Sequence, residues 1–202
     1  GDCFFDWGRK EDFPQRLEDH ATEIISTGAE MISLGGDHYV TYPLLKAHAK
    51  KHGPLSLVHF DAHRDVEPDD GGRIDHGTMF GYAVREGLID PKKSVQIGIR
   101  TVFAGERTYG FKIVYADEVH ESTPAQMADI IRKVVGSNKA YLTFDIDCLD
   151  PSTAPGTGTP VPGGLTSYQA LAILRATGPG DIKLTATVEG LTPVTSEITA
   201  TR

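Results

Sequence analysis

Six potential metal ligands lie in three separated clusters of the chain, namely His38, then Asp61, His63 and Asp65, then Asp145 and Asp147. Each cluster directly follows a short apolar run that predicts a β-strand, at residues 31–34, 55–60 and 140–144. Side chains two residues apart on a strand point to the same side, and ligands of an open parallel sheet gather beyond the carboxyl ends of its strands. We therefore expect the three clusters to converge on one metal site.

The composition of this ligand set indicates which metal it suits. Six ligands exceed the four that complete a structural zinc site, whereas carboxylates with two imidazoles suit two bridged divalent ions, and Mn²⁺ fits the oxygen-rich mixture best. Two such ions held close together are typical of hydrolases. Taken singly, each cluster is more often a capped turn or a solvated strand end, but burying so many acids without cations would be very costly.

Strand and helix patterns alternate along the chain, which predicts a mainly parallel sheet between two layers of helices. We expect a single α/β domain over residues 1–202. His59 shares a strand face with Asp61, and its imidazole is expected either to support the ligands or to be an ordinary buried histidine. Helices are expected at residues 13–27, 40–52, 124–135 and 166–177, and further strands at 94–99, 112–115 and 182–188.

Composition and charge are consistent with a soluble enzyme and decide little more about function. The formal net charge of −8 over 202 residues argues against a nucleic-acid surface. No apolar run approaches the length of a membrane span. Cys3 and Cys148 are far apart, and Cys148 lies inside a metal motif, so we expect no disulfide and a cytoplasmic location.

Several motifs resemble those of the ureohydrolase family of arginases and agmatinases. The metal motifs are Gly-Gly-Asp-His at 35–38, Asp-Ala-His-Arg-Asp at 61–65 and Asp-Ile-Asp-Cys-Leu-Asp-Pro at 145–151. The agmatinase branch is the closer one, because bacterial agmatinases are also similar at residues 75–80, 86–90, 94–100, 143–150 and 154–160. The resemblance covers nearly the whole chain and implies an arginase/deacetylase-like fold with three layers, α/β/α.

The resemblance implies how the ligands are shared between two Mn²⁺ ions per chain. One ion would be held by His38, Asp61, Asp65 and Asp145, and the other by Asp61, His63, Asp145 and Asp147. Asp61 and Asp145 would therefore bridge the ions, with a hydroxide between the ions as the nucleophile.

The resemblance also implies catalytic and substrate-binding residues. Asp65 would orient the hydroxide, and His76 would transfer protons without binding metal. Glu189 would pair with the substrate guanidinium beside Thr159, although the acid that the family usually carries three residues earlier is Ala186 here. The chemistry is consistent, because a carboxylate is the bidentate acceptor that a guanidinium needs. A histidine that titrates near neutrality can protonate the departing amine.

The predicted reaction is hydrolysis of agmatine to putrescine and urea. The acidic loop after Asp65, with Glu67, Asp69 and Asp70, would repel the α-carboxylate of arginine. Guanidinobutyrate, guanidinopropionate and arginine stay open as alternative substrates, and so does a non-catalytic metal-binding fragment. By resemblance we expect a homo-oligomer, a trimer or hexamer. Because family members are longer, we expect the domain to be truncated at both ends, with residues 196–199 beginning a final helix.

Overall fold

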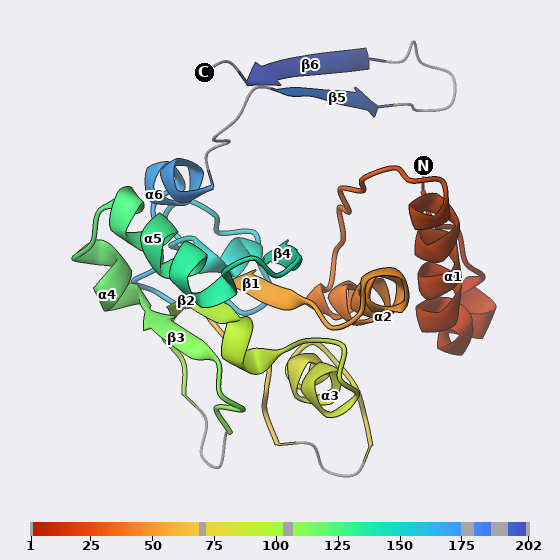
Figure 1. Cartoon of the computed structure of the whole chain (residues 1–202), viewed down its shortest axis with the longest axis horizontal. Helices are drawn as coiled ribbons and strands as arrows, with labels where there is room; N and C mark the ends of the chain where they lie inside the picture. Colours follow the sequence, from red (N-terminus) through yellow and green to blue (C-terminus); the bar gives the residue numbers. More distant parts are fainter. Residues whose placement is uncertain (1, 69–71, 103–106, 175–179, 187–193, 201–202) are drawn as a thin grey trace.

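A four-stranded parallel sheet forms the centre of the fold. The computed structural model describes residues 2–68, 72–102, 107–174, 180–186 and 194–200, the last two segments by their backbone alone. Strands β1 (Ser56–Phe60), β2 (Val95–Ile99), β3 (Lys112–Tyr115) and β4 (Ala140–Phe144) lie in the order β3-β2-β1-β4, and every neighbouring pair is parallel (Figure 1). All residues of β1 and β2 are buried, as expected for strands covered on both faces.

Helices cover both faces of this sheet. They are α2 (Thr41–His52), α3 (Met79–Arg85), α4 (Ala116–His120), α5 (Pro124–Val135) and α6 (Ser167–Ile173). Helices α2 and α3 pack on one face around Leu45, Leu57 and Phe80. Helices α4, α5 and α6 share a second core with the other face, around Phe60 and Met127. The expected three-layer α/β/α architecture with a mainly parallel sheet is confirmed.

Helix α1 (Phe13–Ser26) lies outside this core and packs mainly on α2 (Figure 1). Ala21 and Ile25 of α1 form a small buried cluster with Leu44 and Ala47 of α2. Helix α2 is therefore apolar on two sides, which explains why most of its first two turns is buried.

Local sequence signals set the helix ends. Thr123 and Gln126 form a reciprocal capping box at the start of α5, and Gly136 ends that helix with a φ of 62°. Gly53 ends α2 in the same way, with a φ of 76°. Short 3₁₀ helices lie between the other elements, at η1 (Trp7–Asp12), η2 (His38–Val40), η3 (Pro91–Lys93) and η4 (Ile146–Cys148).

The strand predicted at residues 31–34 is wrong. Residues 29–35 have no regular secondary structure, and Ile32 and Leu34 are 67% and 93% exposed. An apolar run becomes a strand only where a neighbour satisfies its backbone hydrogen bonds. None of the strands in the described residues pairs with this segment.

The C-terminal elements also differ from the prediction. Strand β5 (Gly180–Ala186) pairs antiparallel with β6 (Val194–Ala200) in a separate two-stranded sheet, instead of joining the parallel sheet (Figure 1). Residues 196–199 lie within β6 and do not begin a helix, because Ile198 and Thr199 are β-branched and favour a strand. Helix α6 ends at Ile173, earlier than predicted, and residues 175–179 lie outside the described residues.

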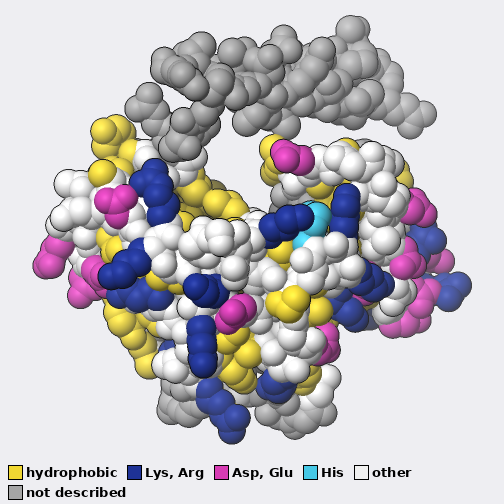
Figure 2. Space-filling model, viewed as in Figure 1, with side chains coloured by type: hydrophobic (Ala, Val, Ile, Leu, Met, Phe, Trp, Pro, Cys, Tyr) yellow, Lys and Arg dark blue, Asp and Glu magenta, His cyan; other side chains and the backbone are white. Residues whose placement is uncertain are grey.

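The surface carries charges of both signs. On the face drawn in Figure 2, basic and acidic side chains are interspersed among apolar ones, although the chain as a whole has a formal net charge of −8. Among the residues that the structure describes, no helix is both long and apolar enough to cross a membrane.

Candidate metal centre

The candidate ligands lie beyond the carboxyl ends of β1 and β4. Asp61 directly follows β1 and Asp145 directly follows β4. Each aspartate then closes a tight turn: Oδ1 of Asp61 accepts a hydrogen bond from the backbone N–H of His63 at 2.6 Å, and Oδ1 of Asp145 accepts one from that of Asp147 at 2.9 Å. The strand therefore ends at the first ligand of each pair, and a turn rather than strand alternation places the second.

One group of ligands surrounds the imidazole of His38, which stands in η2. Its Nδ1 lies 3.0 Å from Oδ2 of Asp61, 3.0 Å from Oδ2 of Asp65 and 3.2 Å from Oδ2 of Asp145. Its Nε2 lies 2.8 Å from Oγ1 of Thr143 in β4. The predicted ligands of the first ion are thus brought together around one nitrogen atom.

This arrangement fits a cation. Nδ1 of His38 is buried and makes no aligned hydrogen bond, although carboxylate oxygens surround it. When Nε2 donates its proton to Thr143, Nδ1 carries a lone pair that faces these carboxylate oxygens. A divalent ion bound between them would accept that lone pair and the oxygen lone pairs as ligands.

A second group of ligands surrounds the imidazole of His63. Its Nδ1 lies 3.0 Å from Oδ2 of Asp147 and 3.3 Å from Oδ1 of Asp61. Asp61 therefore presents Oδ2 to the first group and Oδ1 to the second. Asp145 faces His38 through Oδ2, while its Oδ1 is engaged by the backbone of Asp147. The contacts place Asp61 between the two groups and place Asp145 with the first.

The carboxylates and imidazoles strongly shift one another's proton affinity. Burial alone would lower the pKa of His38, but the carboxylates of Asp61 and Asp65 raise it to about 10. Asp147 and Asp61 raise the pKa of His63 to about 10 as well. Burial raises the pKa of Asp65 to about 8, and the negative charge of Asp61 adds to this rise. The cluster thus holds protons tightly, as expected where several buried acids lie close together.

Comparison with known proteins places this site in a family. A family model described as the arginase family matches residues 1–201. The chain belongs to the arginase family. It is 54% identical over 180 residues to an agmatinase of Chromobacterium violaceum, covering 88% of this chain and 55% of that relative. The chain spans just over half the length of the curated relatives it matches. The predicted resemblance is confirmed.

Solved structures of the arginase family agree with the observed fold. A protein described as a hypothetical agmatinase from Burkholderia thailandensis is 54% identical, with a TM-score of 0.82 over 86% of this chain and 55% of its own. Proclavaminate amidino hydrolase from Streptomyces clavuligerus is 42% identical, with a TM-score of 0.73 over 80% of this chain and 56% of its own.

Two further candidate site residues of this arginase-family chain, His76 and Thr159, line one cavity of about 1450 Å³ together with the two ligand groups. His76 lies at this cavity, and its Nδ1 is 3.1 Å from Oδ2 of Asp37. Thr159 lies there too, and its hydroxyl donates to Oδ2 of Asp147 at 3.1 Å. Glu189 lies outside the described residues.

Sequence reasoning missed several residues that support the ligands. Oγ1 of Thr143 contacts His38 and lies 3.1 Å from Oγ1 of Thr41, so both threonines hold that imidazole in place. Asp37 contacts His76. Thr143 lies in β4 two residues before Asp145, so strand alternation counted back from that ligand could have indicated Thr143. Asp65 adopts a φ of 54°, a left-handed conformation that aspartate tolerates better than most residues.

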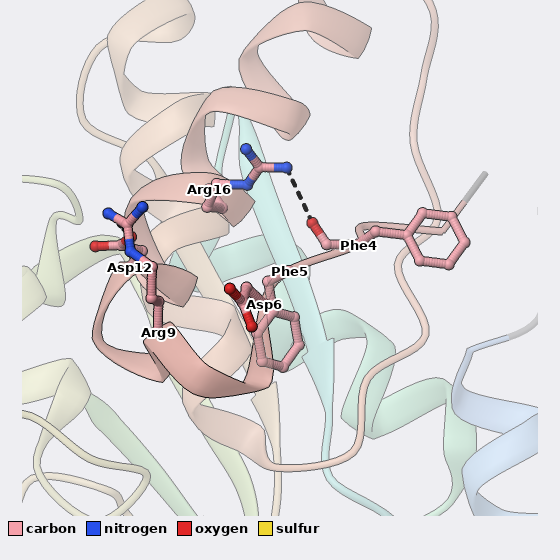
Figure 3. A pocket seen from close by; sticks show the side chains of 6 residues that line it. All are labelled: Phe4, Phe5, Asp6, Arg9, Asp12 and Arg16. Atoms are coloured by element: carbon pink, nitrogen blue, oxygen red, sulfur yellow. Dashed lines mark hydrogen bonds and ion pairs between the residues drawn. The ribbon is translucent and has the colours of Figure 1, made fainter.

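A second, smaller cavity of about 260 Å³ lies near the N-terminus and shares no lining residue with the larger one. Its charged side chains serve local contacts: Arg9 pairs with Asp12, and Arg16 donates to the backbone oxygen of Phe4 at 3.2 Å (Figure 3). Asp6 caps η1 by accepting from the backbone of Gly8. No histidine or cysteine lines this cavity, so it does not compete with the metal centre for the chemistry.

Proposed function

We propose that this protein is a binuclear metal amidinohydrolase that cleaves the guanidinium of agmatine to putrescine and urea, with two Mn²⁺ ions per chain. One observation carries the proposal: the two oxygens of Asp61 face two separate ligand groups, centred on His38 and His63. A carboxylate shared in this way is what a pair of adjacent divalent ions requires.

We assign roles to the residues of the site as follows. Two bound ions would supply a hydroxide nucleophile at neutral pH. Asp65 orients the nucleophile, and His76 delivers a proton to the departing amine while Asp37 holds its Nδ1. Glu189 binds the guanidinium, and Thr159 lies at the cavity wall beside Asp147.

Agmatine is the favoured substrate because the agmatinases compared above are among the most similar relatives. Glu67 lies at the cavity close to His76 and Gly77, where an α-carboxylate would be repelled. Asp69 and Asp70, also predicted to repel it, lie outside the described residues. The likeness to proclavaminate amidino hydrolase keeps a second candidate, another compound with a terminal guanidino group.

Urea release tests this proposal. The Mn²⁺-loaded protein should release urea from agmatine with a far higher kcat/KM than from arginine, guanidinobutyrate or guanidinopropionate. Comparable efficiencies on agmatine and arginine would refute the substrate assignment. Two bound ions with no urea from any of the four compounds would instead identify a non-catalytic metal-binding protein.

His76→Asn tests the proton-transfer assignment. If His76 protonates the leaving amine and binds no metal, this change should lower kcat on agmatine by roughly 10² to 10⁴ and leave the Mn²⁺ content unchanged. His120→Asn is a matched control, because His120 is exposed and its ring nitrogens contact the backbone oxygen of Gly163 and the side chain of Gln169, away from the metal centre. Loss of Mn²⁺ from His76→Asn would make His76 a ligand.

We also propose a homo-oligomer, a trimer or hexamer, in the cytoplasm. The location is supported by Cys3 and Cys148, which are both free thiols in the structure. Sedimentation analysis of the purified protein measures the oligomeric state, and a monomer at micromolar concentration would contradict the proposed assembly.

A further inference from the structure

His59 is a fully buried histidine directly beneath the metal centre, and the proposed reaction gives it no role. It precedes Asp61 by two residues and lies on the same face of β1. Its Nε2 is 2.8 Å from Oδ2 of Asp61, and its Nδ1 is 3.0 Å from Nε2 of Gln96 in β2. Both ring nitrogens are therefore engaged, and the position of the ring proton decides what His59 does.

The side chain of Gln96 settles where that proton lies. Nε2 of Gln96 is 2.7 Å from the backbone oxygen of Arg64. A carbonyl oxygen only accepts hydrogen bonds, so the amide group must present its nitrogen there. The same nitrogen faces Nδ1 of His59, which consequently accepts its second N–H. The single proton of the imidazole is then on Nε2, and it is donated to Oδ2 of Asp61.

Strand register makes this contact part of a polar row across the sheet. His59 is the register partner of Gln96 on β2 and of Thr143 on β4. Gln96 and His59 are fully buried, and Thr143 is 7% exposed. Burying polar side chains is costly unless they are satisfied or serve a purpose. In this row His59 contacts Oδ2 of Asp61, and Thr143 contacts His38, so the row supports two ligands of the group around His38, one of which also faces His63.

We propose that Gln96 and His59 form a hydrogen-bond relay that holds Asp61 with Oδ2 toward His38 and Oδ1 toward His63, and thereby sets the metal affinity of the site without binding metal. This role rests on the proposed two-metal function. The fixed tautomer matters because an N–H at Nε2 donates to Oδ2 of Asp61, and together with the backbone N–H of His63 on Oδ1 it keeps the carboxylate from turning about its Cβ–Cγ bond. His59 is a positioning residue in this scheme, and Gln96 acts through it.

The alternative is that His59 is itself a ligand. His38, His59, Asp61 and Asp65 each have one potential ligand atom within 4.8 Å of the others. The relay favours a supporting role, because a nitrogen that carries a proton cannot coordinate a metal and the other nitrogen is turned toward Gln96. Histidines and amides that orient ligands from behind typically change metal affinity about 10- to 100-fold when replaced.

Mn²⁺ titration of the metal-free protein tests the relay without relying on turnover. His59→Leu removes the donor to Asp61 and should raise the Mn²⁺ dissociation constant roughly 10- to 100-fold. His59→Gln retains an N–H that can reach Asp61 and should restore most of the affinity. Gln96→Met keeps the shape of the glutamine but frees the tautomer of His59, so it should weaken binding by less than His59→Leu.

Ser94→Ala is the matched control for these variants. Ser94 is fully buried on the chain just before β2, two residues from Gln96, and its Oγ bonds the backbone of Leu57 and Asp90 at 2.8 and 2.6 Å. Removing the Ser94 hydroxyl breaks buried hydrogen bonds beside the same sheet and leaves the contacts of the metal ligands unchanged. It should lower thermal stability while Mn²⁺ affinity stays at the wild-type value, and circular dichroism checks that every variant is folded.

Nitrogen chemical shifts of ¹⁵N-labelled histidine supply a readout that a merely structural role would not change. In the metal-free wild type, His59 should be the neutral tautomer with its proton on Nε2, and Gln96→Met should shift the Nδ1 resonance while Ser94→Ala should not. A proton on Nδ1 in the wild type would overturn the relay.

The binding data separate the remaining outcomes. Loss of one ion from both His59→Leu and His59→Gln, with wild-type affinity in Gln96→Met, would make His59 a ligand and overturn the relay. Two ions bound with equal affinity by all variants would overturn the relay and leave the proposed function intact. A wild-type protein that binds no Mn²⁺ would overturn the function and the relay together.

Discussion

Asp61 is the residue on which both ligand groups depend. Its Oδ2 faces His38 and its Oδ1 faces His63, whereas Asp147 contacts only the second group. Asp61→Asn should therefore remove both Mn²⁺ ions, and Asp147→Asn should remove one. Metal analysis of the purified variants measures the number of ions per chain.

Asp150→Asn is the control for this comparison. Asp150 follows the same strand as Asp147, but its carboxylate accepts hydrogen bonds from the backbone of Ser152, Gly163 and Gly164. Both ions should remain in this variant. Retention of one ion at full affinity in Asp61→Asn would show that Asp61 does not bridge.

Protons compete with metal at this site. The pKa of Asp65 is raised to about 8, and the pKa values of His38 and His63 are raised to about 10, so all three hold a proton at pH 7 when no metal is bound. Ligands must lose these protons to coordinate an ion. Mn²⁺ affinity should therefore rise as pH rises from 6 through 8, and binding should release protons.

Calorimetry in buffers of different ionisation enthalpy measures the number of protons released. Asp61→Asn, which should bind no ion, controls for heat that does not come from the site. Binding without net proton release, at an affinity that does not change between pH 6 and 8, would contradict the raised pKa values.

At the scale of elements, the position of β2 against the Asp61 turn is set by Gly98. This residue lies at an irregularity in the β2–β3 register and has a φ of 92°. A Cβ added here would lie 3.0 Å from Sγ of Cys148 and 3.1 Å from the backbone oxygen of Asp61. Gly98→Ala should cost roughly 3 kcal/mol of unfolding free energy through strain and crowding, and it should also weaken Mn²⁺ binding.

Gly87→Ala separates the cost of backbone strain from the cost of crowding by the added Cβ. Gly87 also has a positive φ, 70°, but an added Cβ would meet no atom within 4 Å. Its replacement should cost only the backbone strain, about 1 kcal/mol, with no change in metal binding. Denaturant unfolding measures both values, and equal costs at the two positions would show that crowding beside Asp61 is unimportant.

At the scale of the whole molecule, the metal centre brings together three segments that are far apart in the sequence. Its candidate ligands come from η2, from the turn after β1 and from the turn after β4, so bound ions would cross-link distant parts of the chain. Each Mn²⁺ ion, at a concentration about a hundredfold above its Kd, should stabilise the fold by roughly 2.7 kcal/mol.

For a chain of 202 residues this stabilisation corresponds to a rise in Tm of roughly 5–10 °C for each ion that binds. Differential scanning calorimetry with and without a chelator measures it. The control is Asp61→Asn, whose Tm should not respond to Mn²⁺. A wild-type Tm that is equally insensitive would show that the ligands hold no ion in the folded protein.

The sequence alone determined the features that depend on local pattern. The apolar runs at 55–60, 94–99, 112–115 and 140–144 correspond to the four parallel strands, because the hydrophobic pattern of a buried strand can be recognised from neighbouring residues alone. The helix at 124–135 was predicted within a residue, because a cap and a glycine mark its ends locally. The ligand clusters could also be recognised from the sequence, because each is a short motif of neighbouring residues.

Tertiary structure alone decided what depends on pairing between distant segments. The apolar run at 31–34 and the C-terminal run near 182–188 have strand-like sequences. The first is unpaired among the described strands, and the part of the second that lies in β5 pairs with β6. Strand register brings Gln96 beside His59 across 37 residues of sequence, and the packing of η2 near the end of β4 brings His38 to Thr143 across 105. No local pattern encodes such partners, because the free energy of a contact depends on which strand lies alongside.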